Sequence, residues 1–320
     1  MPYVAPSSDE NRATTRPTVM VPREYVHRVA VSEVFLTGWK PAAEVTGGAT
    51  DGAEFVVRAQ WPRTHTVFVP NGGSLDSMLL IESVRQAGTL LSHAEFGVPF
   101  GHQFLLWDMS VDADPTLFAP AAVPVEVELR MVCAETSRRR AALTGARYDV
   151  TVLRDGRAMA TASASFRCIG PEVHRRLRAG RPTAAVRTTA PALAPATVGH
   201  TGDRNVLLAH PPVGSRTGNL WELRVDTGHP NYFDHPVDHV PGMVLLEAAR
   251  QAARAVTNRP KALLLALRGR FTRYAEFDAP CWIEAFPETA EATGITRVRV
   301  HGTQGRQTVF TAELGLGDPA

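Results

Sequence analysis

The residues best suited to chemistry gather in one stretch, residues 229–247, immediately before and within a predicted helix. One histidine on an apolar face is usually a core residue, whereas three within eleven positions, alternating with aspartate, indicate a functional site. Imidazole and carboxylate groups held together can move a proton between a hydroxyl and a leaving group. The stretch supplies the catalytic candidates His235, His239 and Glu247 and the substrate-binding candidate His229.

The Pro241-Gly242 pair predicts that a helix begins there. The first amides of a helix have no partner within it, so they can donate to the developing oxyanion of a thioester carbonyl. Gly242 and Met243 are therefore candidate oxyanion-binding residues. Glu247 and Arg250 are three positions apart and share a helix face. An arginine beside a buried glutamate holds it as a carboxylate, which serves either as a base or in a structural ion pair.

Other common reaction centres are absent from the sequence. The histidines of residues 235–239 lack the helical spacing of zinc hydrolases, so a metal site is set aside. The chain has no glycine-rich phosphate loop and no Gly-x-Ser-x-Gly, and Cys281 has no evident partner base. The three cysteines are odd in number and far apart, which predicts reduced structural thiols. We expect neither a metal nor an organic cofactor.

An internal duplication repeats part of the candidate set. Residues 78–87 and 243–252 are identical at six of ten positions, at an offset of 165 residues (243 minus 78). The first copy has Asp-Ser where the second has Pro-Gly, and it lacks counterparts of the two catalytic histidine candidates. One complete site is therefore expected and not two. The repeat adds Glu82 and Arg85, opposite Glu247 and Arg250, and His65, opposite His229.

The elements that must position these residues are two long helices and several strands. Both repeated helices are apolar around most of their circumference, which predicts that they are buried. Runs of alternating apolar and polar residues follow each helix and predict strands with one face inward, at residues 125–131, 148–153 and 308–314. One buried helix wrapped by an antiparallel sheet is the hotdog architecture. The expected fold class is α+β, a tandem (double) hotdog.

The amino-acid composition is that of a globular protein, and the chain is long enough for two domains or for one domain duplicated. Of the 320 residues, 44% are hydrophobic and 21% charged, and no apolar run approaches the length of a membrane span. A net charge of +2 gives no basic field for nucleic acid, and nothing directs the chain out of the cytoplasm. Basic clusters such as residues 174–178 are interpreted as solvated turns or a docking surface. The predicted divisions are a disordered tail (1–22), a first hotdog unit (23–170), an exposed linker (171–199) and a second hotdog unit (200–320).

The motifs of this sequence resemble those of two known protein families. The Pro-Gly, Glu-Ala and Gln pattern of residues 241–251 is similar to that of the β-hydroxyacyl carrier-protein dehydratases, which are hotdog proteins. More specifically, four separate stretches resemble the A-factor biosynthesis (AfsA-type) family, and the likeness runs from about residue 26 to residue 316. These stretches are residues 33–39, 59–63, 97–102 and 233–243.

The resemblance implies an acyltransferase. In the A-factor family a β-ketoacyl group, carried by acyl carrier protein or coenzyme A, is joined to a hydroxyl of dihydroxyacetone phosphate. The ester closes to a butenolide phosphate, the precursor of γ-butyrolactone signals that control antibiotic production. A hotdog thioesterase or dehydratase, and a non-catalytic acyl-binding scaffold, remain alternatives. A homodimer is left open, and neither nucleic acid nor a membrane is an expected partner.

The same resemblance assigns roles to the candidates. The base is Glu247, Glu82 or a loop histidine, and Arg85 or Arg250 binds the phosphate, a need that a neutral acyl substrate would not create. In dehydratase-type hotdog dimers the histidine loop of one unit faces the helix of the other. We therefore expect composite sites, and the expected neighbours are His235 or His239 with Glu82, and His65 with Glu247.

Overall fold

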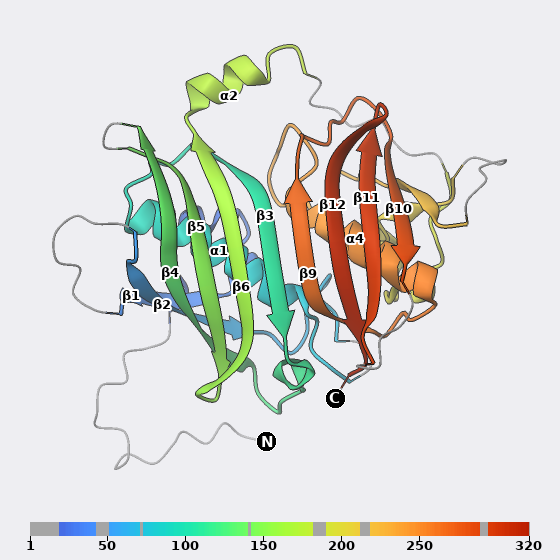
Figure 1. Cartoon of the computed structure of the whole chain (residues 1–320), viewed down its shortest axis with the longest axis horizontal. Helices are drawn as coiled ribbons and strands as arrows, with labels where there is room; N and C mark the ends of the chain where they lie inside the picture. The colour runs from blue at the N-terminus through green and yellow to red at the C-terminus, as the bar shows by residue number, and fades with distance from the viewer. Residues whose placement is uncertain are drawn as a thin grey trace.

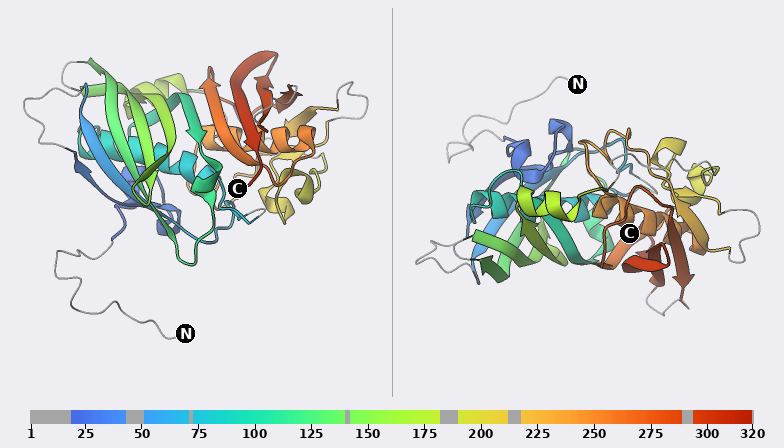
Figure 2. Two further views of the ribbon diagram at one scale, coloured as in Figure 1. Left: turned by 60° about the horizontal axis from the view of Figure 1, so that its bottom comes forward. Right: turned by 90° about the horizontal axis from the view of Figure 1, so that it is seen from above.

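The computed structural model describes residues 19–42, 51–70, 73–139, 142–181, 190–211, 218–288 and 294–319. Within them, one 12-stranded antiparallel sheet wraps around two long helices, α1 (Met78–Ala94) and α4 (Gly242–Thr257) (Figure 1). Both helices lie on the same side of the sheet, as the turned views of Figure 2 show. The expected double hotdog fold is confirmed.

The strand order is the same in both halves when it is followed outward from the centre of the sheet. It runs β3-β6-β5-β4-β2-β1 on one side and β9-β12-β11-β10-β8-β7 on the other. The duplication predicted from the sequence is therefore a duplication of the fold. The strands are β1 (Leu36–Pro41), β2 (Glu54–Trp61), β3 (Gln103–Ala113), β4 (Val125–Arg139), β5 (Ala142–Arg154), β6 (Arg157–Ile169), β7 (Leu208–Ala209), β8 (Leu220–Leu223), β9 (Leu263–Phe271), β10 (Cys281–Pro287), β11 (Thr296–Gln304) and β12 (Gln307–Gly317).

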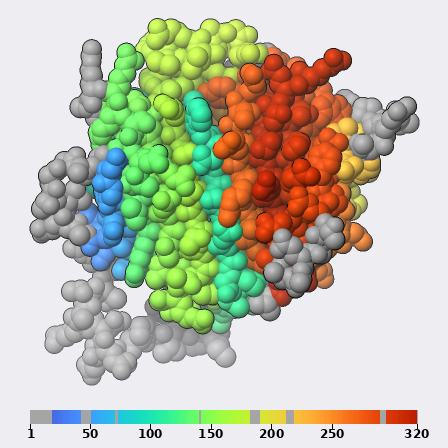
Figure 3. Space-filling view, viewed as in Figure 1, coloured from blue at the N-terminus to red at the C-terminus, as the bar shows by residue number. Residues whose placement is uncertain are grey.

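The two halves join along β3 and β9, which pair antiparallel from Asp108↔Arg270 to Asp112↔Ala266. On the outer face these two strands lie side by side at the middle of the surface in Figure 3. Only part of β3 takes part, because β9 ends at Phe271 and leaves Gln103–Trp107 of β3 without a partner strand from the second half. This interruption of the junction determines where the main cavity opens.

The ends of the long helices follow from local chemistry. Before α1, the Asp76 carboxylate accepts a hydrogen bond from the Met78 amide at 2.8 Å, which satisfies one of the free amides of the first turn. Pro241 precedes α4, and Asn258 ends it in the left-handed conformation (φ 52°). The shorter helices are η1 (Arg23–Val26), η2 (Val31–Glu33), η3 (Pro115–Phe118), α2 (Pro171–Leu177), α3 (Pro195–Val198) and η4 (Asp203–Asn205).

The predicted strands and thiols agree with the structure. Residues of β4 alternate between buried and exposed, as its sequence pattern requires. Cys133, Cys168 and Cys281 are free and buried, and burial raises the pKa of each thiol to about 12, so that all three stay protonated. No helix of the described residues is long and apolar enough to cross a membrane.

The segment predicted as an exposed linker makes hydrogen bonds to the second half at both of its ends. Arg178, just after α2, binds Asp238 and Glu276, and the Leu193 amide donates to the Leu208 carbonyl. The middle of the segment, residues 182–189, and most of the predicted tail, residues 1–18, lie outside the described residues. The four-part division of the chain stays a prediction.

Candidate active site

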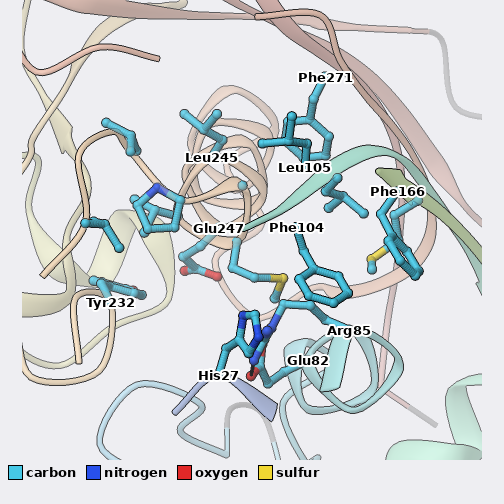
Figure 4. A pocket seen from close by; sticks show the side chains of 18 of the residues that line it. His27, Glu82, Arg85, Phe104, Leu105, Phe166, Tyr232, Leu245, Glu247 and Phe271 are labelled. Atoms are coloured by element: carbon cyan, nitrogen blue, oxygen red, sulfur yellow. Dashed lines mark hydrogen bonds and ion pairs between the residues drawn. The ribbon is translucent and has the colours of Figure 1, made fainter. Parts of the chain in front are cut away.

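A cavity of about 860 Å³ lies between α1 and the segment that leads into α4. Both halves line it, so the site is composite, as expected. Figure 4 shows its apolar wall and, facing that wall, the polar side chains His27, Glu82, Arg85 and Glu247. The volume is in the range of small-molecule sites, and the apolar wall suits an acyl chain. That wall includes Phe104, Leu105, Phe166, Leu245 and Phe271.

The cavity opens where β3 runs past the end of β9. Its exposed lining residues all belong to the first residues of β3 or to the end of β9 and the loop that follows. We call this group the mouth. The mouth consists of Gln103, Trp107, Arg270, Thr272 and Arg273.

Glu82 lies at the polar end of the cavity and is held by two arginines. Arg28 donates to Oε1 from Nε at 3.1 Å and from Nη2 at 2.7 Å. Arg85 donates to Oε2 at 2.8 Å and to Oε1 at 2.7 Å, and Gln86 donates to Oε1 at 2.8 Å. Burial alone would raise the pKa of Glu82, but the charges of Arg28 and Arg85 outweigh it and lower the pKa to about 2. Glu82 is therefore a fixed carboxylate and a weak base.

A chain of contacts joins this carboxylate to the histidine loop of the other half. Arg28 also lies 3.5 Å from Asp234, and the Val29 amide donates to Asp234 at 2.9 Å. The Asp234 carboxylate in turn lies 2.6 Å from Nδ1 of His235. His235 thus stands on the Glu82 side of the cavity, linked to Glu82 through Asp234 and Arg28, which agrees with the predicted proximity of His235 and Glu82.

The geometry fixes the protons of His235. An ionised carboxylate accepts from Nδ1–H, so the neutral ring carries its lone pair on Nε2. Within the described residues, Nε2 of His235 has no partner, and the side chain lines the cavity with 38% of its surface exposed. His239 repeats the arrangement, since its Nδ1 lies 2.7 Å from Asp238. Each of the two predicted catalytic histidines is therefore oriented by the aspartate that precedes it.

The predicted amide donors also face the cavity. Gly242 and Met243 line it, and the first turn of α4 uses the Val244 and Leu245 amides to bond the Pro241 carbonyl. No described residue accepts from the Gly242 or Met243 amide. Two free N–H groups at the positive end of a sixteen-residue helix are thus available to an oxyanion.

Glu247 lines the cavity too, but its charge is already matched. Nε2 of His200 lies 3.0 Å from its Oε1, and Nη2 of Arg250 lies 2.7 Å from its Oε2. Burial would raise the pKa of Glu247, yet Arg250 and His200 outweigh it and hold the pKa below its ordinary value. The expected neighbour His65 is wrong: the histidine beside Glu247 is His200.

Arg250 does not reach the cavity. Its side chain is completely buried and binds Asp76 at 2.5 Å as well as Glu247, and it is not among the lining residues. Arg250, predicted to bind a substrate phosphate, is therefore not placed to do so, because its guanidinium lies between the Asp76 and Glu247 carboxylates. Arg85 does line the cavity, although it donates to Glu82 and to the Val26 carbonyl.

Known proteins agree with this fold. A profile of the A-factor biosynthesis hotdog domain matches residues 9–170 and 182–315. The chain belongs to the A-factor biosynthesis hotdog family. It is 47% identical over 93% of its length to the 2-oxo-3-(phosphooxy)propyl 3-oxoalkanoate synthase of Streptomyces virginiae, of which it covers 98%. To the synthase of the same name from Streptomyces coelicolor it is 38% identical over 96% of its length and 95% of that protein.

A solved structure supports the fold alone. The crystal structure of a protein assigned as an oleoyl thioesterase, from Lactobacillus plantarum, matches with a TM-score of 0.55 at 11% identity, over 85% of this chain and 99% of that one. The double hotdog is thus shared with thioesterases, and this member of the A-factor family differs from them in almost all of its side chains.

Two predicted substrate-binding histidines of this family member have structural roles. Nδ1 of His65 accepts from the Val67 and Phe68 amides, and its Nε2 lies 3.2 Å from Glu33. His229 does the same in the second half, with two amides and the Asn205 side chain. Neither histidine is among the cavity-lining residues. Burial first, then the charge of Arg204, lowers the pKa of His229 to about 4, so it braces its loop as a neutral ring.

His27 lines the cavity although it was not among the residues predicted from the sequence to form the site. Its backbone is left-handed (φ 54°), which is unusual for a residue other than glycine, and its side chain lines the cavity. Nε2 of His27 lies 2.8 Å from Nε2 of His93, whose Nδ1 donates to the Val98 carbonyl at 2.6 Å. Burial, then the charge of Arg85, lowers the pKa of His27 to about 3, so the ring is neutral. No group of three metal-binding side chains occurs within the described ranges.

Proposed function

We propose that the chain joins a β-ketoacyl group to the hydroxyl of dihydroxyacetone phosphate, giving a 2-oxo-3-(phosphooxy)propyl 3-oxoalkanoate. The ester is the precursor of a γ-butyrolactone-type signal, as in the A-factor family. The observation that carries the proposal is one cavity in which an aspartate-bound histidine and two free helix amides face an apolar chamber. These are a base, an oxyanion site and a place for an acyl chain.

In the proposed reaction His235 is the general base. Its Nε2 takes the proton of the substrate hydroxyl as the hydroxyl oxygen attacks the thioester carbonyl carbon. The carbonyl oxygen becomes an oxyanion and accepts from the Gly242 and Met243 amides. The C–S bond then breaks, the proton passes from Nε2 to the departing sulfur, and the ester and free thiol are released. Asp234 orients His235 throughout and stabilises its imidazolium form.

Other polar residues have supporting roles. Glu82 holds Arg28 in the position from which Arg28 contacts Asp234, so it acts on His235 indirectly. Arg85 places positive charge beside the reacting groups. His239 is the second candidate for the base, since its Nδ1 is bound by Asp238 in the same way. We assign Glu247 a structural role because its carboxylate is bound by Arg250 and His200.

The proposal extends to the donor and the units. The thioester comes from acyl carrier protein or coenzyme A, and the acyl chain lies against the apolar wall. Residues 23–170 and 200–320 are the proposed hotdog units. A cytoplasmic location stays a prediction of the sequence.

Mass spectrometry of the purified protein with a β-ketoacyl thioester, with and without dihydroxyacetone phosphate, tests the proposal. The phosphorylated ester or its butenolide should form only when both substrates are present. Free acid or enoyl product without dihydroxyacetone phosphate would assign a thioesterase or dehydratase, and thioester binding without turnover would assign a scaffold. His235→Asn should abolish the ester while His210→Asn, at an exposed histidine that is not among the lining residues, should not.

A further inference from the structure

We propose that Arg270 and Arg273, at the mouth of the cavity, form a binding site for a phosphate group of a substrate. This inference deepens the proposed function, on which it rests, by assigning the phosphate to the mouth and not to the helix arginines. Both residues are among those that line the cavity, both are exposed, and neither has an ion pair or side-chain hydrogen bond to any other described residue.

The arginines inside the cavity are already engaged. Arg28 and Arg85 share Glu82, and Arg28 also contacts Asp234, so two positive charges face two negative ones. An incoming phosphate would have to displace these buried contacts, which is unfavourable because a buried carboxylate would lose its partner. A dianion is instead attracted to cations that have no partner.

No described acid forms an ion pair with either arginine of the mouth, although Asp108 also lines the cavity. Asp108, opposite Arg270 in the strand register, accepts from Ser165 and lies 4.0 Å from Arg147. The remaining mouth residues, Gln103, Trp107 and Thr272, are uncharged. The mouth therefore has two uncompensated positive charges, and guanidinium groups match phosphate oxygens in geometry as well as in charge.

A second observation points to unmet hydrogen-bonding capacity nearby. The hydroxyl of Tyr274, which follows Arg273 and also lines the cavity, is buried and has no hydrogen-bond partner within the described part of the chain. Burying such a group without a partner is costly, so a ligand that accepts a hydrogen bond there would be favoured.

The mouth is also connected to the oxyanion amides. After Arg273, Ala275 pairs with Val240 in an isolated bridge, and the Val240 amide donates to the Ala275 carbonyl at 2.9 Å. Val240 is two residues before Gly242. Phe271, between Arg270 and Thr272, also has ring carbons 3.4 Å from the position that a Cβ on Gly242 would take, so the mouth adjoins the first turn of α4.

Two phosphates could use such a site, that of dihydroxyacetone phosphate and that of the donor's phosphopantetheine arm. The test compares the wild type with the double variant Arg270→Gln/Arg273→Gln, using a β-ketoacyl N-acetylcysteamine thioester, which has no phosphate, as donor. We expect the KM for dihydroxyacetone phosphate to rise about tenfold or more, with a smaller change in kcat. A rise only in the KM of a coenzyme A or carrier-protein donor would assign the same site to the donor phosphate.

Arg268→Gln is the matched control. Arg268 is on the same strand, binds Asp112 and is not among the lining residues, so its loss should change neither KM more than twofold. Arg270→Lys/Arg273→Lys should restore part of the affinity. Unchanged KM values for both substrates in the glutamine double variant, with an unchanged melting temperature, would overturn the proposal.

Binding without turnover separates this inference from the proposed function. Glycerol 3-phosphate titrated into the full chain should bind to the wild type and to Arg268→Gln but more weakly, by about tenfold, to the glutamine double variant. If the wild type makes no ester and this difference is still found, the phosphate site stands and the acyltransferase assignment fails. Equal binding by all three proteins would overturn the phosphate site.

Discussion

The two long helices have the same Glu-x-x-Arg-Gln sequence, yet their arginines lie in different surroundings. Arg250 of α4 meets Asp76 from the start of α1 and is completely buried, whereas Arg85 of α1 keeps 19% of its side chain exposed and lines the cavity. The repeat offset of 165 places Pro241 at the position that corresponds to Asp76 (76 plus 165). The second half therefore has no carboxylate there to close over Arg85.

One sequence difference between the halves, Asp76 in the first and Pro241 in the second, thus accounts for one open site at the cavity and one closed site at Arg250. Where the carboxylate is present, the pseudo-equivalent site is filled by an ion cluster of Asp76, Arg250, Glu247 and His200. Where Pro241 replaces it, the helix start is free, the amides of Gly242 and Met243 are available, and the cavity remains. In this account the α4 cluster serves stability, and the α1 side serves chemistry.

Replacing each of the two helix arginines with methionine should give the largest difference in stability between the two halves. Arg250→Met removes the cation between two buried carboxylates, leaving Glu247 with His200 and Asp76 with the Met78 amide, and the free energy of unfolding should fall by about 3–5 kcal/mol. Arg85→Met leaves Glu82 with Arg28 and Gln86, so the loss should be about 1–2 kcal/mol. Urea unfolding of both variants measures the difference. Equal losses of unfolding free energy in the two variants would show that Arg85 and Arg250 contribute equally to stability, which would contradict the comparison.

Gly242→Pro sharpens the assignment of the open site. Proline is accepted at the first position of a helix, so α4 should persist, but the amide proton of residue 242 is lost. We expect kcat to fall about 10²–10³-fold, the usual effect of removing one oxyanion donor. Circular dichroism checks that the fold is kept. A folded variant with wild-type kcat would remove this amide from the mechanism.

Acid should affect stability through the same buried carboxylates. The folded pKa of Glu82 is lowered from 4.5 to about 2, so its contribution to stability is present above pH 4.5 and is lost as the pH falls toward 2. The difference, 4.5 minus 2, corresponds to on the order of 3 kcal/mol. Glu247 acts in the same direction because its pKa is lowered too. Stability curves of the wild type and Glu82→Gln between pH 6 and pH 2 should diverge less as the pH falls.

Surface ion pairs should matter least. Asp112→Asn breaks the contact between Asp112 and Arg268, whose side chains are about half exposed, and should cost less than about 1 kcal/mol. The measurement is again urea unfolding. A loss as large as that of Arg250→Met would mean that burial does not separate the two kinds of ion pair.

Local patterns were enough to predict the architecture. The helix start at Pro241, the alternation of β4 and the repeat around Glu82 and Glu247 all depend on residues close together in sequence. These features are local or repeated, so the sequence displays them directly. The composite cavity was instead expected from the resemblance to dehydratase-type hotdog dimers, in which the histidine loop of one unit faces the helix of the other.

The partners of the two glutamates were not predictable in this way. Arg28 and His200 lie 54 and 47 residues from the glutamates they bind, in irregular segments without periodicity. A signal did exist, since residues 34–36 answer 206–208 at an offset of 172 (206 minus 34), which pairs Arg28 with His200. His27 had no such signal, because its left-handed backbone and its contact with His93 appear only in three dimensions.

The most direct test of the account compares His235→Asn, at the cavity, with His200→Asn, in the ion cluster around Arg250. Turnover of a β-ketoacyl thioester with dihydroxyacetone phosphate is measured per folded molecule, together with the free energy of unfolding. His235→Asn should lose about 10²–10⁴ in kcat and keep its stability. His200→Asn should lose about 1–3 kcal/mol of stability and keep its turnover. The opposite result, with turnover lost in His200→Asn and kept in His235→Asn, would place the chemistry at Glu247 and contradict the account.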